Sequence, residues 1–90
     1  MTDDPETFER YAAVLRPLLP YLGDEPVDRG MSLTDLGLDS FGIVQALVEL
    51  EAEFGVEFPD DRLTAETFAS VGSLWEALAS LAEAGRADAR

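Results

Sequence analysis

The sequence predicts an all-α protein, and three observations support that prediction. Apolar residues recur three or four positions apart in three separate segments, which is the spacing of one helix face. No alternating apolar and polar run reaches the length of a strand. Proline, glycine, serine and aspartate stand at the ends of the periodic segments, where they begin or end helices. Ninety residues suit one core, so we expect a single domain over 1–90 with its core at about 5–84.

The first periodic segment predicts a helix that begins at Pro5. Asp4 suits the N-cap, and proline is favoured at the first helical position because an N–H there would be unpaired anyway. Pro17 predicts a kink or an end near Leu15, because proline removes a helical hydrogen bond. The face expected to reach the core consists of Phe8, Tyr11, Ala12, Leu15 and Leu19.

Residues 21–39 predict a long connection between the first and second helices. Glycine and proline recur through it, and loops of this length in compact domains are uncommon and often functional. The side chains expected to pin the loop to the core are Val27, Met31, Leu33, Leu36 and Leu38.

The second helix is predicted from Ser40 to Phe54, with Gly55 as its C-terminal stop. Its core face is expected to hold Ile43, Ala46, Leu47, Leu50 and Phe54. The opposite face is also apolar, with Phe41, Val44, Val48 and Ala52. Two interpretations stay open: a central helix buried on two faces, or an exposed apolar strip that docks a partner.

The rest of the chain predicts a turn, a short helix and a last long helix. The turn is expected at Phe58–Asp61 and the short helix near Thr64–Ala69, with Leu63 and Phe68 pointing inward. Ser70 is expected to cap the last helix, Gly85 to end it, and residues 86–90 to fray. The stripe of the last helix is Val71, Leu74, Trp75, Leu78, Leu81 and Ala82. The expected architecture is a bundle of four helices, three longer and one short.

Composition excludes several classes of function. Nineteen acidic residues against six arginines give a net charge of −13, which disfavours binding to nucleic acids and to anionic membranes and favours partners with basic patches. The absence of cysteine and histidine excludes disulfides, thiolate sites, His-ligated zinc and Ser-His or Cys-His triads. We therefore expect no catalytic residue, no metal site and no enzyme. No apolar run is long enough to span a bilayer, and the acidic N-terminus is unlike a signal peptide, so we expect a cytoplasmic protein.

The most informative segment is Asp35-Leu36-Gly37-Leu38-Asp39-Ser40-Phe41-Gly42. It places one serine between a turn and the strongly periodic second helix. Ser40 can be interpreted as an ordinary residue of a helix start, where Asp39 and serine satisfy unpaired N–H groups. It can also be interpreted as a covalent attachment point that the start of the helix holds at the surface.

This segment resembles the attachment motif of acyl and peptidyl carrier proteins. The similarity extends from about Leu33 to about Leu81, and the run Leu38–Gln45 is most similar to free-standing peptidyl and D-alanyl carrier proteins. The resemblance implies the carrier-protein fold, with 4′-phosphopantetheine from coenzyme A attached covalently to Ser40. Asp39 would then be the helix cap, a contact to the modifying enzyme, or both. Phe41 stands where most acyl carriers have an aliphatic residue, which favours a carrier of a dedicated pathway over one of fatty-acid type.

The family resemblance also implies partners and a role. A phosphopantetheinyl transferase would modify Ser40, and an adenylation or acyl-loading enzyme would load an aminoacyl or acyl group as a thioester. Downstream synthase or tailoring enzymes, of a non-ribosomal peptide or polyketide type, would then use it. We expect Phe41, Val44 and Val48 to face these partners, with Glu49 and Glu51 as an acidic rim, and the carrier to be a monomer.

A different class of function remains as an alternative. An acidic helical bundle with an apolar strip can act as a non-covalent adaptor that binds a partner helix in a groove. An adaptor would explain the acidity and the strip of Phe41, Val44 and Val48. It would not explain why a Gly-Leu-Asp-Ser turn precedes the strip. Dependence on a covalent arm distinguishes the two functions.

Overall fold

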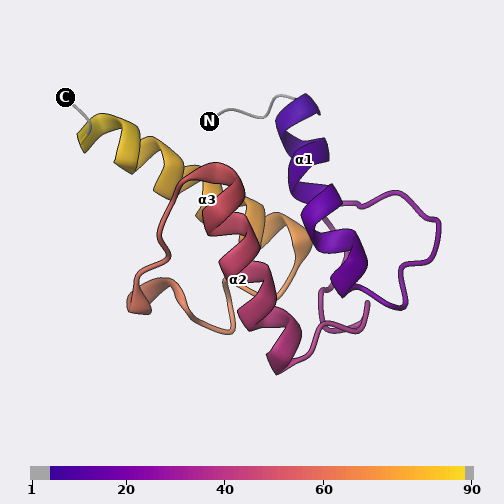
Figure 1. Ribbon diagram of the computed structural model, residues 1–90. Helices are drawn as coiled ribbons and strands as arrows, with labels where there is room; N and C mark the ends of the chain where they lie inside the picture. The colour runs from indigo at the N-terminus through magenta and orange to yellow at the C-terminus, as the bar shows by residue number, and fades with distance from the viewer. Residues whose placement is uncertain (1–4, 89–90) are drawn as a thin grey trace.

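The computed structural model describes residues 5–88, with side chains as far as Glu83. It contains three α-helices, α1 (Pro5–Leu15), α2 (Ser40–Phe54) and α3 (Val71–Asp88). Two single turns of 3₁₀-helix, η1 (Arg16–Leu18) and η2 (Asp60–Arg62), lie between them. Within this range no strand forms, and an isolated antiparallel bridge joins Ser32 to Ser70. The predicted helical class is confirmed. Figure 1 shows α1 and α2 side by side and running in opposite directions, with α3 crossing behind α2.

The first helix follows the proline signals of the sequence. It begins at Pro5 and ends at Leu15, and the chain continues through Pro17 as η1. The expected cap, Asp4, lies outside the described residues. Tyr11, Leu15 and Leu19 are buried, and Phe8 packs partly buried against them, as the spacing predicts.

Both ends of α2 agree with the capping signals. At its start the Asp39 carboxylate accepts a hydrogen bond from the Gly42 N–H over 2.7 Å. At its end Gly55 adopts a left-handed φ of 64° and its N–H donates to the Glu51 carbonyl. Ala46 and Leu50 are buried, and the other predicted core-face residues of α2 pack partly buried around them.

The predicted short helix at 64–69 is wrong. These residues form turns, in which the Thr67 N–H donates to the Thr64 hydroxyl. Phe68 N–H donates to Thr64 O over 3.3 Å, but the next N–H, that of Ala69, donates to Glu66 O in a tighter turn. One turn fixes several residues for few hydrogen bonds, so it does not propagate as a helix. Phe68 packs against the core as expected, whereas Leu63 is 42% exposed and does not point inward.

The last helix continues past the predicted stop. Residues 71–88 are helical, so Gly85 lies within α3 and the expected fraying from 86 is wrong as far as Asp88. Residues 89 and 90 lie outside the described part of the chain. Glycine costs a helix about 1 kcal/mol relative to alanine, but it ends a helix only where it turns left-handed, as Gly55 does.

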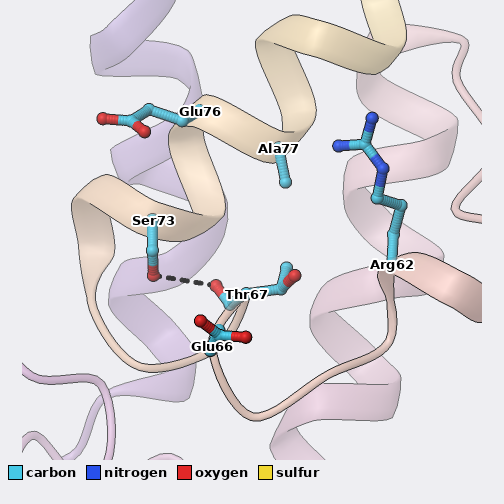
Figure 2. A pocket seen from close by; sticks show the side chains of 6 residues that line it. All are labelled: Arg62, Glu66, Thr67, Ser73, Glu76 and Ala77. Carbon is cyan, nitrogen blue, oxygen red and sulfur yellow. Dashed lines mark hydrogen bonds between the residues drawn. The ribbon is translucent and has the colours of Figure 1, made fainter.

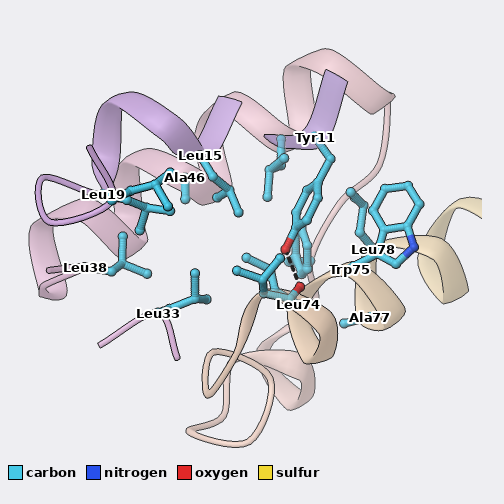
Figure 3. Close-up of a cluster of buried hydrophobic side chains, with 14 residues drawn as sticks. Tyr11, Leu15, Leu19, Leu33, Leu38, Ala46, Leu74, Trp75, Ala77 and Leu78 are labelled. Carbon is cyan, nitrogen blue, oxygen red and sulfur yellow. Dashed lines mark hydrogen bonds between the residues drawn. The ribbon is translucent and has the colours of Figure 1, made fainter. Parts of the chain in front are cut away.

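The core is one apolar cluster to which all three helices and the long loop contribute (Figure 3). At its centre the rings of Phe8, Tyr11 and Trp75 lie with centroids 5.0–5.6 Å apart. The Tyr11 hydroxyl donates to the Val71 carbonyl over 2.7 Å, which joins α1 to the start of α3. Burial raises the pKa of the Tyr11 phenol well above its ordinary value, so the hydroxyl keeps the proton that it donates. The fully enclosed residues are Tyr11, Leu15, Leu19, Leu22, Leu33, Leu50, Val71, Leu74, Trp75 and Leu78.

The long loop is held against the start of α3 by its backbone. Val71 N–H donates to Met31 O over 2.9 Å, and Gly72 N–H donates to Arg29 O over 2.9 Å. A side chain at Gly72 would place its Cβ 3.0 Å from the Arg29 carbonyl oxygen, so this approach requires glycine or a small shift. Leu33 and Leu38 are buried as predicted, and the other three predicted loop residues are partly buried against the core.

The buried Tyr11 hydroxyl gives a first prediction. Tyr11→Phe should lower the free energy of unfolding by about 1 kcal/mol, because it removes one buried hydrogen bond and leaves the ring in place. Tyr21→Phe is the matched control, since Tyr21 is 75% exposed and its loss of a hydroxyl should change stability by less than about 0.5 kcal/mol. Urea unfolding measures both. Equal losses in the two variants would contradict the assignment.

The cap of α2 gives a second prediction. Asp39→Ala should destabilise the fold by about 1 kcal/mol, because the Gly42 N–H loses its acceptor. Asp39→Asn keeps an acceptor oxygen and should remain within about 0.5 kcal/mol of the parent. Thermal or urea unfolding distinguishes the two. If asparagine destabilises as much as alanine, then charge and not capping is the property that matters.

Candidate functional site

Ser40 is an exposed residue at the first position of α2. Its hydroxyl makes no hydrogen bond to the described part of the chain, so it is available for modification. The cap on Asp39 is the only side-chain bond at this helix start, and the remaining first-turn N–H groups give the helix end a partial positive charge. A phosphodiester on Ser40 would be favoured there, because anions are stabilised at helix N-termini.

The residues just before Ser40 are fixed by packing and by backbone bonds. Gly37 has a φ of 98°, and a Cβ there would lie 2.7 Å from the Pro20 ring. Leu38 is buried, and its N–H donates to the Leu33 carbonyl over 3.0 Å. Gly42 is buried under Leu38, where an added Cβ would lie 2.8 Å from Leu38 Cδ1. Glycine at position 42 therefore gives room to the leucine that leads the chain into α2.

The apolar residues on the far side of α2 are exposed. Phe41 is 76%, Val44 59% and Val48 60% exposed, and Ala52 is exposed beside them. A second buried face is therefore excluded, and the exposed-strip interpretation describes the helix. We call Phe41, Val44 and Val48 the apolar strip. Beside it is an apolar hollow of about 370 Å³, lined mainly by Ile43, Val44, Leu47, Leu63, Ala65 and Phe68.

The two predicted rim residues lie in different settings. Glu49 is exposed on α2, as a rim residue would be. Glu51 is half-buried, and its carboxylate accepts a hydrogen bond from the Phe58 N–H over 2.8 Å. This bond ties the segment after α2 back to the helix. Glu51 therefore has a structural role, and we leave it out of the proposed docking surface.

Four arginines have described side chains, and each contacts a group within the molecule. Arg10 pairs with Glu53 over 2.9 Å, and Arg16 donates to the Gly23 carbonyl. Arg29 lies over the Phe8 ring, 5.1 Å from its centroid, and Arg62 donates to the Ser80 hydroxyl. The chain carries a net charge of −13, and Asp35 and Asp39 are exposed beside Ser40, so the electrostatic field there is negative.

Tyr21 is the exposed residue near Ser40 that the sequence analysis missed. It is 75% exposed, and its ring lies against Gly37, where a Cβ would be 3.1 Å from Tyr21 Cδ2. An aromatic residue directly after Pro20 was the available signal. Its exposure depends on how the loop packs, which periodicity does not report.

A second hollow, of about 340 Å³, lies between the 62–67 segment and α3 (Figure 2). The Ser73 hydroxyl in this hollow stabilises the fold. It donates to the Thr67 carbonyl over 2.9 Å and accepts from the Ser70 N–H. Figure 2 shows Arg62 at one side of the hollow and Glu76 at the other. The described residues hold no group of three potential metal ligands. Within the same range, no helix has the length and apolar character to cross a membrane.

Comparison with known proteins agrees with this geometry. The family model described as a phosphopantetheine attachment site matches residues 13–78. The acyl carrier protein of Bradyrhizobium sp. (strain ORS 278) is 42% identical over 62 residues, which cover 66% of this chain and 76% of that protein. The acyl carrier protein of Zymomonas mobilis is 39% identical over 56 residues, which cover 62% of this chain and 72% of that protein.

Solved structures show the same fold with a partner. A carrier protein from Agrobacterium tumefaciens, solved with an engineered Bradyrhizobium japonicum glycine:[carrier protein] ligase and AMP, is similar with a TM-score of 0.70 and 25% identity. This match covers 80% of this chain and 97% of that one. A glycylated carrier protein in complex with the B. japonicum ligase has a TM-score of 0.60 and 26% identity, over 77% of this chain and 97% of that one.

The attachment-site model spans most of the chain, the helical fold matches carrier proteins, and a serine with a free hydroxyl stands at the start of the second helix. The chain therefore belongs to the phosphopantetheine-binding acyl and peptidyl carrier protein family, whose prosthetic group is a covalently attached 4′-phosphopantetheine.

Proposed function

We propose that this chain carries an aminoacyl group as a thioester on a 4′-phosphopantetheine arm attached to Ser40. The observation that supports this most directly is the exposed, unbonded Ser40 hydroxyl at the start of a capped helix, within the segment that the attachment-site family matches. When bound, the arm supplies the thiol that a chain without cysteine lacks.

The chain's own residues contribute position and not catalysis. A phosphopantetheinyl transferase with Mg²⁺ supplies the acid–base and metal chemistry. Ser40 Oγ forms a bond to the phosphorus that bears the pantetheine of coenzyme A, the bond from that phosphorus to the adenosine bisphosphate breaks, and the serine proton passes to the transferase. Asp39 keeps the first turn of α2 in place throughout, because its cap does not involve Ser40.

The aminoacyl cargo is supported by the structural neighbours. One neighbour is a carrier bound to a glycine:[carrier protein] ligase, and another is a glycylated carrier. We infer a stand-alone ATP-dependent ligase as the loading partner and later synthase or tailoring enzymes as the users, in a dedicated biosynthetic pathway of the cytoplasm. A fatty-acyl or polyketide cargo would use the same serine. We expect the carrier to act as a monomer, without nucleic acid or membrane.

Docking is proposed to use the apolar strip with Glu49 as its acidic rim. The strip begins directly after Ser40, and each of its three side chains is more than half exposed. An apolar centre with a charged rim is the usual composition of a docking surface.

A second candidate function is a non-covalent adaptor, which the exposed strip alone would favour. An adaptor would bind a partner helix over Phe41, Val44 and Val48 without any modification of Ser40. The family match makes it the weaker candidate, because the match includes the serine turn and not only the strip.

The attachment gives a third prediction. Incubation with coenzyme A, Mg²⁺ and a broad-specificity phosphopantetheinyl transferase should add the mass of one phosphopantetheine, because Ser40 is the accessible nucleophile at the attachment turn. Ser40→Ala should add none and should retain the parent's circular dichroism spectrum and melting temperature within a few degrees. Intact-mass spectrometry reads the result. Uptake by the alanine variant would refute Ser40, and no uptake by the folded parent would favour the adaptor.

The acidic rim gives a fourth prediction. Glu49→Lys should lower kcat/KM of the transferase reaction about fivefold at low salt, which corresponds to the roughly 1 kcal/mol of an exposed ion pair, and less at high salt. Glu83→Lys is the matched control, because it makes the same change in net charge at an exposed position of α3. Steady-state kinetics at two salt concentrations measures both. Equal effects would assign the change to overall charge and remove Glu49 from the surface.

A further inference from the structure

Tyr21 combines high exposure with a fixed position. Its side chain is 75% exposed, almost as much as that of Phe41 at 76%. An exposed side chain on a mobile segment would have to be ordered on binding, at a cost in entropy. The backbone of Tyr21 is held, because its N–H donates to the Leu36 carbonyl over 3.0 Å.

The Tyr21 ring also packs against the loop at Gly37. Pro20 and Tyr21 both pack on Gly37, where an added Cβ would lie 2.7 Å from Pro20 Cγ and 3.1 Å from Tyr21 Cδ2. The segment under them is itself a set of hydrogen-bonded turns, in which Gly37 N–H donates to Thr34 O and Leu38 N–H to Leu33 O, each over 3.0 Å. The chain therefore presents a pre-positioned aromatic surface, and binding it requires little further ordering.

This surface lies close to the attachment serine. Gly37 precedes Ser40 by three residues, so their Cα atoms are at most about 11 Å apart. On the other side of Ser40 the apolar strip extends about 10 Å along α2 from Phe41 to Val48. One half of a standard protein interface covers about 800 Å², which is roughly 30 Å across. An interface centred on Ser40 is large enough to include both Tyr21 and the strip. Figure 1 shows that the end of α1 and the start of α2 lie at the same end of the molecule.

We propose that Tyr21 is a contact residue for the phosphopantetheinyl transferase, on the loop side of Ser40. This inference rests on the proposed attachment to Ser40. The reason for choosing the transferase is geometric: it must bring its active site to Ser40 Oγ itself, so its surface has to surround the serine. Enzymes that act on the cargo work at the far end of the arm and need not touch the loop.

The charge of the chain favours another protein, and not a second copy of this chain, as the partner that contacts Tyr21. The chain carries a net charge of −13, and Asp35 and Asp39 are exposed near the turn. Two copies of such a chain repel each other, whereas an enzyme that binds the phosphates of coenzyme A needs basic groups near its active site. A partner with an apolar depression and a basic rim is complementary to Tyr21 and its acidic neighbours.

The test compares three proteins in the transferase reaction: the parent, Tyr21→Ala and Tyr21→Phe, each in its apo form with coenzyme A saturating. Tyr21→Ala should raise KM for the carrier about tenfold and leave kcat within twofold, because it removes a contact made on binding. Tyr21→Phe keeps the ring and should stay within twofold of the parent in both constants. Amide exchange of Leu36, Gly37 and Leu38 checks that the loop is unchanged.

Each other outcome would overturn the inference in a distinguishable way. An unmodified parent would remove the attachment proposal and this inference with it. A lower kcat with faster amide exchange in Tyr21→Ala would show that Tyr21 only supports the loop. An unchanged KM would exclude the transferase contact. Two further measurements would then identify what the Tyr21 ring contacts instead. A shift of the Tyr21 ring resonances on modification would assign it to the arm, and concentration-dependent sedimentation lost in Tyr21→Ala would assign it to a second copy.

Discussion

The position of Ser40 depends on the pairing between the long loop and the start of α3. Met31 O accepts from Val71 N–H, Arg29 O accepts from Gly72 N–H, and the Tyr11 hydroxyl donates to the carbonyl of the same Val71. The long loop, α1 and the start of α3 thus meet at Val71 and Gly72. A loop of this length has many conformations to lose, so burial of Leu33 and these bonds must offset that entropy. Burial of Ala46 and Leu50 holds α2 against the core, and these bonds fix the loop that leads into its first residue.

From this junction a short series of contacts leads to the serine. Leu33 is enclosed in the core, and its carbonyl accepts from the Leu38 N–H. Leu38 in turn packs against Gly42 in the first turn of α2, and Asp39 caps the same Gly42 N–H. Ser40 thus lies between Asp39 and Gly42, which this hydrogen bond joins, while its own hydroxyl bonds to no described residue. The result is a nucleophile with a fixed backbone and a free hydroxyl, which suits a residue that another enzyme must reach.

The sequence predicts correctly those helix ends that are set by capping residues, glycine or proline at the end itself. The bounds of α2 follow from Asp39 and Gly55, and the end of α1 follows from Pro17, because each acts on its own neighbours. The segment 64–69 has the local pattern of a helix, whereas it forms a set of turns and then pairs with Leu33 of the distant loop. A single turn does not propagate as a helix without packing to support it. Periodicity could not decide whether the second apolar face of α2 is buried or exposed. The sequence pattern of an apolar stripe is the same whether another element packs on it or solvent surrounds it. Tyr21 was missed for the same reason: its exposure is set by Pro20 and Gly37 packing together.

The surface around Ser40 is suited to partners that bind and leave. The net charge of −13 and the exposed Asp35 and Asp39 beside the serine give a negative electrostatic field, and such a field speeds the approach of basic partners more than it strengthens the complex. The apolar contribution comes from the apolar strip, whose side chains are neighbours along one face of α2, and from the hollow of about 370 Å³ beside it. A large apolar interface would dissociate slowly, since differences in affinity lie mostly in the off-rate. Under the proposed function the carrier must leave one enzyme before it meets the next, and a small apolar centre inside an acidic field would give rapid encounter without long residence.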